Sequence, residues 1–400
     1  MSALAFAAIM RLARAMFIVY RGCGDLTNPN SKTLRALETP WVFNPQSRAL
    51  LHSTTPWGKI AQSRNSRVVF LNNQALLIAV VAVTLCFAFI SGLNDSGSLV
   101  ATAISSRALA PRVALLIAAT AVFAGFFLFG GAVASTIGTN LVQAPAMTLD
   151  VLLIATVSAT AWVVFAAFVG LPSSSTHALL GGLIGAVTIT HGYHFLLIDG
   201  FIKVLLVLFL APLIGLSGGY LFMRLTIFST RGASPRINQF FRRVQMFNVI
   251  ALGLSYGAND GQKVVALMTM ALVAATQQTT FLVPLWVKLV CAVALLIGMG
   301  TGGWRTIRTL GRRIYKLRPV HAFVGQTSSA AIVLTAAALG GPVSTPQVVS
   351  TSIMGVGSAE RMSGVRWGVA EQIVLSWLLT IPTSALVAAG LQMIGSYFGF

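Results

Sequence analysis

The chain has 400 residues, of which 56% are hydrophobic and only 9% are charged. Soluble domains carry roughly 25% charged residues, so this composition excludes an ordinary soluble domain and indicates a polytopic membrane protein. The net charge of +19 would suggest nucleic-acid binding in a soluble chain, but no aromatic interleaving or nucleic-acid-binding motif accompanies the basic residues.

Residues 1–70 differ in composition from the rest of the chain. They hold nine lysines and arginines, and their apolar start is interrupted by Arg11 and Arg14. A cleaved signal peptide would have basic residues before its apolar run, whereas here they follow it. We expect residues 1–70 to form a basic N-terminal extension, interfacial or disordered, ahead of the membrane-embedded part.

Long apolar stretches follow from residue 75 onward. Most approach the ~20 residues that a helix needs to cross the hydrocarbon core of a membrane. They cover residues 75–92, 113–137, 147–170, 200–223, 245–258, 281–303, 321–341 and 367–395. Two basic blocks lie between them, at 224–243 and 305–318, and the positive-inside rule places both in the cytoplasm.

The chain contains two copies of one unit. Asn94-Asp95 recurs as Asn259-Asp260, 165 residues later, and PSSS at 172–175 recurs as PVST at 342–345, 170 residues later. Two matches in the same order indicate a duplication. We expect a first repeat over 71–226, a basic cytoplasmic linker over 227–244, and a second repeat over 245–400. Paired polar interruptions of this kind are typical of transporters, whose sites lie where broken helices of two repeats meet.

Each copy places an acid, Asp95 or Asp260, inside an apolar segment. An ionised carboxylate at the membrane midplane costs a few kcal/mol even on lenient scales, so each acid needs a partner or a proton. The acids could bind a cation, carry protons, or accept a hydrogen bond from a protonated oxyanion. Alternatively, each Asn-Asp pair caps the helix that follows it. Asn94 and Asn259 add amide donors and carbonyl acceptors at the same breaks.

Lys263 is the main difference between the two copies, because the equivalent position in the first copy is Ser98. It shares a helix face with Asp260, three residues before it. Its ammonium group could neutralise the acid, attract an anion, or occupy the space of a metal ion. The alternative is that Lys263 extends to a membrane interface.

The two proline-led segments are rich in hydrogen-bond donors and carry no fixed negative charge. Pro172 suits the first turn of a helix, and the free amides of that turn would lie beside four hydroxyl residues, 173–176. Two such starts facing each other could surround a tetrahedral oxyanion; the alternative is that the hydroxyls bond to their own helix backbone. His177 is either a proton relay or a hydrogen-bond donor that locks the loop, and Glu371 is either interfacial or a third intramembrane acid.

These motifs resemble the inorganic phosphate transporter (PiT, or PHO4) family, in its bacterial low-affinity branch. GLNDSGSLVATAISSRALAPR is similar to the family's first signature, GANDGQK to its second, and PSSSTH and PVSTPQ to its two Pro–Ser elements. The similarity runs from about residue 75 to the end of the chain. It implies an all-α polytopic membrane fold of two inverted repeats, with broken helices, re-entrant Pro–Ser segments and about 10–12 transmembrane segments.

The resemblance implies import of inorganic phosphate, alone or as a metal complex, by symport with protons or sodium ions, and no catalysis. The substrate-binding residues would be Ser174, Ser175, Thr176, Ser344, Thr345, Asn94, Asn259 and Lys263. The coupling ion or proton would be handled by Asp95, Asp260 and His177. We expect no catalytic residue, no resident metal, no cofactor besides the coupling ion, and no nucleic-acid partner.

Two departures from the family pattern bear on mechanism. Sodium-coupled relatives carry a further Asn three residues after each Asp, where this chain has Ser98 and Lys263. Replacing a neutral oxygen ligand by an ammonium group favours protons over sodium as the coupling ion. In the second Pro–Ser element, Pro346-Gln347 replace the family's Thr-His, which leaves that half of the site and the choice of anion open.

Three alternatives remain at this point: a sulfate permease of the same family, an intramembrane hydrolase using a serine with His177 and an aspartate, and a receptor that binds phosphate without moving it. We expect a multi-pass protein of the bacterial inner membrane, in contact with membrane lipid. The sequence leaves the oligomeric state open, a homodimer included.

Overall fold

A computed structural model of the chain describes residues 56–170, 173–234, 236–277, 280–313, 315 and 317–397. The chain divides into two units, Met1–Asn72 and Asn73–Phe400. In the first unit only residues 56–72 are described, and they are helical. The expected N-terminal extension over residues 1–70 therefore lies almost wholly outside the described residues.

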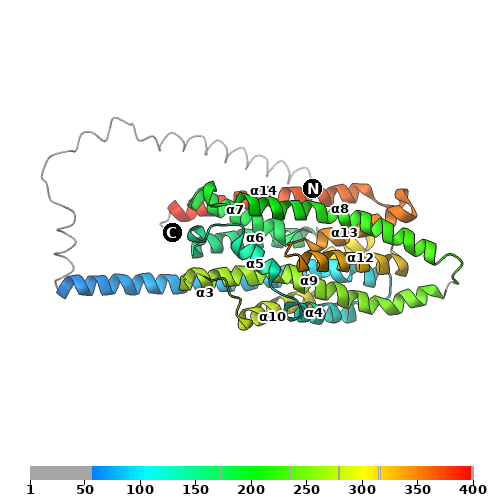
Figure 1. The fold of residues 1–400 in the computed structure, drawn as a ribbon, viewed down its shortest axis with the longest axis horizontal. Helices are drawn as coiled ribbons and strands as arrows, with labels where there is room; N and C mark the ends of the chain where they lie inside the picture. Colours follow the sequence, from blue (N-terminus) through cyan, green and yellow to red (C-terminus); the bar gives the residue numbers. More distant parts are fainter. Residues whose placement is uncertain are drawn as a thin grey trace, which may run out of the picture. The chain divides into compact units, whose positions relative to one another are not determined.

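The described part of the chain is helical and contains no strand (Figure 1). The first half comprises α3 (Pro56–Ser105), α4 (Pro111–Leu128), α5 (Ala132–Thr139), α6 (Leu149–Val169), α7 (Ser175–Thr190) and α8 (Ile198–Ser229). The second half comprises α9 (Ile237–Thr276), α10 (Leu285–Thr301), α11 (Trp304–Arg308), a π-helical turn (Thr309–Arg313), α12 (Pro319–Ala338), α13 (Thr345–Glu360) and α14 (Trp367–Tyr397). Three 3₁₀ turns, Ala144–Ala146, Tyr193–Phe195 and Met362–Gly364, complete the loops.

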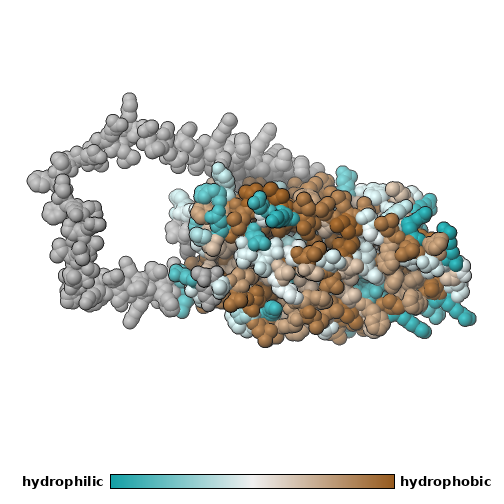
Figure 2. All heavy atoms as spheres, viewed as in Figure 1, coloured by the Kyte–Doolittle hydropathy of each residue, from teal (hydrophilic) through white to brown (hydrophobic). Residues whose placement is uncertain are grey.

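Six of the described helices are long and apolar enough to cross a membrane, or seven when α10 and the bent segment Trp304–Gly311 count as one span. Those two segments meet at an angle of 55°. The expected 10–12 segments would also include shorter or more polar helices such as α7, α9 and α13, which lie outside this count. On the visible face of the second unit, apolar side chains cover the middle, and hydrophilic ones gather at the end where α8 joins α9 (Figure 2).

The two halves pack on each other through reciprocal contacts. A methyl group on Gly257 of α9 would collide with the Val122 carbonyl of α4, and one on Gly92 of α3 would collide with the Leu295 carbonyl of α10. Gly92 and Gly257 are the glycines of the two Asn–Asp motifs, so the duplicated sequences make duplicated contacts.

The second pair of reciprocal contacts joins α7 to α14 and α13 to α8. Here Gly185 abuts the Ala385 carbonyl, and Gly355, its counterpart in the second repeat, abuts the Leu216 carbonyl. Glycine is required at these positions because the helix backbones approach more closely than any side chain allows. The expected class, an all-α polytopic fold of two repeats, is confirmed.

Candidate functional site

The Asn–Asp pairs lie in the middle of continuous helices. α3 runs without interruption through Asn94-Asp95, and α9 runs through Asn259-Asp260. The expectation that these pairs break a helix or cap the following one is therefore wrong. Both acids are buried, and their oxygens bond to side chains, so they need no free helix amide.

The interruptions lie instead at the Pro–Ser segments, between α6 and α7 and between α12 and α13. α7 and α13 each follow a serine with an extended backbone: Ser174 has φ −99° and ψ 110°, and Ser344 has φ −103° and ψ 105°. The matching backbone follows from the matching sequence. Ser174 caps its helix by accepting from the His177 amide at 3.2 Å, whereas the buried Ser344 hydroxyl has no hydrogen-bond partner among the described residues.

Lys263 links the two helix starts. Its ammonium group contacts Asp260 and donates to Thr176 of the first repeat, and it lies 3.4 Å from the Val343 carbonyl. Thr345 of the second repeat donates to the other oxygen of Asp260. Lys263 is 1% exposed, so it does not extend to an interface, and the charge of Asp260 is balanced inside the protein.

Asp95 of the first repeat belongs to a second network, whose other members come from both repeats. Asn94 donates to one of its oxygens at 3.1 Å, and the Tyr256 hydroxyl of α9 donates to the other at 2.9 Å. Asn94 in turn accepts from Thr306 of α11 at 3.3 Å. Sequence reasoning did not identify Tyr256 or Thr306, because the only signal either gives is a polar group inside an apolar helix.

Asn259 fixes the backbone that leads into α13. Its side chain donates to the Gly341 carbonyl at 2.9 Å and accepts from the Val343 amide at 3.1 Å. These two bonds satisfy backbone groups in a non-helical segment that is buried in the protein, as such segments must be at membrane depth. Asn259 therefore positions the Ser344 and Thr345 hydroxyls.

His177 lies at the edge of the hydroxyl cluster. Its Nδ1 is 2.6 Å from the Ser174 hydroxyl and 3.4 Å from the Gln347 amide nitrogen, so the first and second repeats meet there. None of these contacts is a carboxylate, and the described residues give His177 no acid that could orient it as a catalytic base. A cavity of about 650 Å³ begins at His177 and Gln347 and extends to Glu371 near the start of α14.

The structure thus gathers most of the predicted site residues in one place. Thr176, Thr345, Asp260 and Lys263 are in direct contact, and Ser174, Ser175 and Ser344 lie in the same two helix starts. Asp95 is in a separate network that reaches the others through Tyr256, one turn before Asp260 on α9. Two helix starts with several hydroxyls and one ammonium group form an environment that suits an oxyanion.

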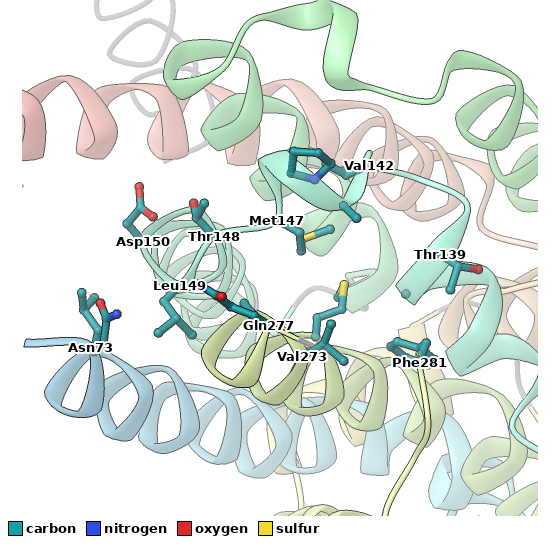
Figure 3. A pocket seen from close by; sticks show the side chains of 16 residues that line it. Asn73, Thr139, Val142, Met147, Thr148, Leu149, Asp150, Val273, Gln277 and Phe281 are labelled. Carbon is teal, nitrogen blue, oxygen red and sulfur yellow. The ribbon is translucent and has the colours of Figure 1, made fainter. Parts of the chain in front are cut away.

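A larger cavity of about 800 Å³ lies at the far end of α9 (Figure 3). The side chains of Asn73, Thr148, Asp150 and Gln277 line one part of it, and Phe281 lines another. Met270 also lines this cavity. It lies seven residues after Lys263 on α9, a distance of about 10 Å along the helix axis. No motif in the sequence had indicated this cavity.

Residues 91–388 match the family model described as the PHO4 phosphate transporter family. A protein of Bacillus subtilis named "Probable low-affinity inorganic phosphate transporter" is 38% identical over 320 residues, which cover 78% of this chain and 95% of the relative. A protein of Mycobacterium bovis with the same name is 39% identical over 342 residues, 82% of this chain and 81% of the relative. A solved structure titled "The sodium-dependent phosphate transporter" has a similar fold, with a TM-score of 0.73 and 24% identity over 81% of this chain and 99% of that one.

Proposed function

The chain belongs to the PHO4 phosphate transporter family, and from this premise we propose that it imports inorganic phosphate by symport with protons rather than sodium ions. It is a multi-pass protein of the cell membrane, as its apolar helices and bacterial relatives indicate. The substrate would bind between the starts of α7 and α13, held by their hydroxyls and by Lys263.

The position of Lys263 is the observation that favours protons over sodium ions as the coupling ion. Its ammonium group lies against Asp260 and Thr176, in the space that a sodium ion bound by these oxygens would need. Two positive charges a few ångströms apart inside a protein repel each other by several kcal/mol at an effective dielectric constant of about 20. A proton needs neither that space nor a coordination shell, because it adds to an existing group.

The acids favour phosphate over sulfate. Phosphate near neutral pH retains a proton that a carboxylate can accept as a hydrogen bond, whereas sulfate is fully ionised and offers none. Asp260 already accepts from Thr345 and contacts Lys263, so a further anion without a proton would be repelled unless it took over one of these partners. We therefore propose phosphate, with sulfate as the competitor to test.

The test is flux of labelled phosphate into proteoliposomes of the purified chain. We expect a pH gradient, alkaline inside, to drive accumulation, with little change when choline replaces sodium, and we expect excess sulfate to compete poorly. Accumulation that requires a sodium gradient would reverse the choice of ion. Binding without any flux would instead indicate a receptor.

A further inference from the structure

A small basic pocket lies apart from the central site, where the end of α6 meets α11. It has a volume of about 260 Å³ and is lined by Phe168, Val169, Gly170, Arg305, Arg308 and Thr309. No acid lines it. At ~30 Å³ per water molecule, the pocket has the volume of about nine waters, which is enough for a phosphate group with part of its hydration.

Close packing shapes one wall of this pocket. Arg305 donates to the Phe168 carbonyl, and Thr309 donates to the Gly170 carbonyl at 2.9 Å. Gly170 has φ +77°, and a methyl group on it would lie 2.9 Å from the Arg305 side chain. The arginine at 305 is thus fixed against the end of α6, at Phe168 and Gly170.

Arg308, one turn further on, has no hydrogen bond or ion pair with any described residue, and it is exposed at the pocket. Its guanidinium group keeps all five of its donors for another partner. Planar guanidinium donors match phosphate oxygens better than any other side chain does. The pocket therefore offers one fixed and one free arginine to a phosphate group.

The same short helix reaches the central site. Thr306 lies between the two arginines in sequence and donates to Asn94 at 3.3 Å, and Asn94 donates to Asp95. Just before α11, the Gly303 amide donates to the Ser96 hydroxyl at 2.6 Å. A change in the position of α11 would therefore alter the hydrogen bonds of the Asn94–Asp95 pair directly.

We propose that this pocket is a second phosphate-binding site, on the cytoplasmic side, which receives phosphate that leaves the central site. The inference rests on the proposed function. Its place in the second basic block, 305–318, puts it on the side where release into the cytoplasm occurs. The same chemistry would also suit the headgroup of an anionic lipid, which the experiment separates from free phosphate.

The experiment compares Arg308→Gln with wild type by exchange of labelled phosphate in right-side-out and inside-out membrane vesicles. Loss of a charged donor to phosphate costs about a factor of ten or more in affinity. We expect the half-saturating phosphate concentration to rise about tenfold at the cytoplasmic face and to stay unchanged at the outer face. Arg308→Lys keeps the positive charge but loses the planar pair of guanidinium donors. Its half-saturating concentration at the cytoplasmic face should lie between those of wild type and Arg308→Gln.

Arg242→Gln is the matched control, because Arg242 is an exposed arginine near the start of α9, in the other basic block. Arg242→Gln should leave the half-saturating phosphate concentration unchanged at both faces of the membrane. If the half-saturating concentration in Arg308→Gln rises equally at both faces, or does not rise at all, the proposal of a second phosphate site is overturned. Absence of exchange in wild-type vesicles would instead count against the proposed function.

The lipid arm repeats the comparison in proteoliposomes of phosphatidylcholine, with and without phosphatidylglycerol. A difference between Arg308→Gln and wild type that persists in phosphatidylcholine alone assigns the pocket to free phosphate. A difference that appears only with phosphatidylglycerol present assigns it to a lipid headgroup and overturns the release role.

Discussion

Asp260 and Lys263 form a buried ion pair, each with a side chain that is 1% exposed. Removing one partner of such a pair leaves an uncompensated charge and costs about 3–5 kcal/mol, whereas replacing both partners is often nearly neutral. Stability and transport can therefore be separated at this site by comparing single and double substitutions.

We expect Asp260→Asn to abolish phosphate accumulation and to lower the unfolding temperature in detergent, because Lys263 is left without its acid. The double variant Asp260→Asn/Lys263→Gln should recover most of the stability and none of the transport. Thermal unfolding and labelled uptake, measured on the same preparations, check both parts. Wild-type uptake by the single variant would remove Asp260 from the proposed mechanism.

Lys263→Asn should move the ion dependence of uptake toward sodium. It removes the fixed ammonium group and adds a neutral oxygen beside Asp260, Thr176 and Thr345. Uptake at varied sodium concentration and fixed pH measures the shift. Lys263→Met is the control, since it removes the charge without supplying an oxygen and should lose activity without gaining a sodium response. Unchanged coupling in Lys263→Asn would contradict the proton proposal.

Much of the site at this scale could be predicted from sequence. The contact of Lys263 with Asp260 follows from their spacing of three on a helix, and the repeat predicts that Ser174 and Ser344 share one backbone conformation. The contact of Tyr256 with Asp95 joins residues 161 apart. It depends on how α3 lies against α9, and the apolar pattern of two helices does not fix their relative register.

At the scale of elements, the glycine contacts hold α7 on α14 and α13 on α8. Gly185→Ala and Gly355→Ala should each destabilise the protein by about 1–3 kcal/mol, because the added methyl group collides with a backbone carbonyl that only a helix shift can move away. Gly300→Ala on α10 is the control, since a methyl group there meets nothing within 4 Å. Thermal unfolding of the three variants measures the difference, and equal stability of all three would contradict the close packing.

Helix boundaries show where sequence reasoning fails at this scale. A polar Asn–Asp pair in an apolar segment looks like a helix end, because its groups would be costly if left unpaired. In the structure the partners come from other helices, such as Thr345 for Asp260 and Tyr256 for Asp95, so the helix continues. The Pro–Ser breaks were predicted correctly because their cause is local, but the helix starts were not: α7 begins at Ser175 and α13 at Thr345, three residues after the leading proline of each segment.

At the scale of the whole molecule, each repeat depends on the other. α4 packs on α9, α3 on α10, α7 on α14 and α8 on α13, so most close helix pairs join the two halves. We expect residues 1–232 and 233–400 to restore phosphate uptake when they are produced together in one cell, and neither half to do so alone. Uptake and co-purification of the two pieces measure this. Transport by one half alone would contradict a site shared between repeats.

The reciprocity of these contacts has the geometry of an isologous dimer, in which patch a of one subunit meets patch b of the other and the reverse. A single ancestral unit that entered the membrane in both orientations would make the same contacts with its own copy. A single chain that contains both copies can carry Ser98 in one copy and Lys263 at the equivalent position of the other. One half therefore holds an amine at this position and the other a hydroxyl, a difference that two identical subunits could not have.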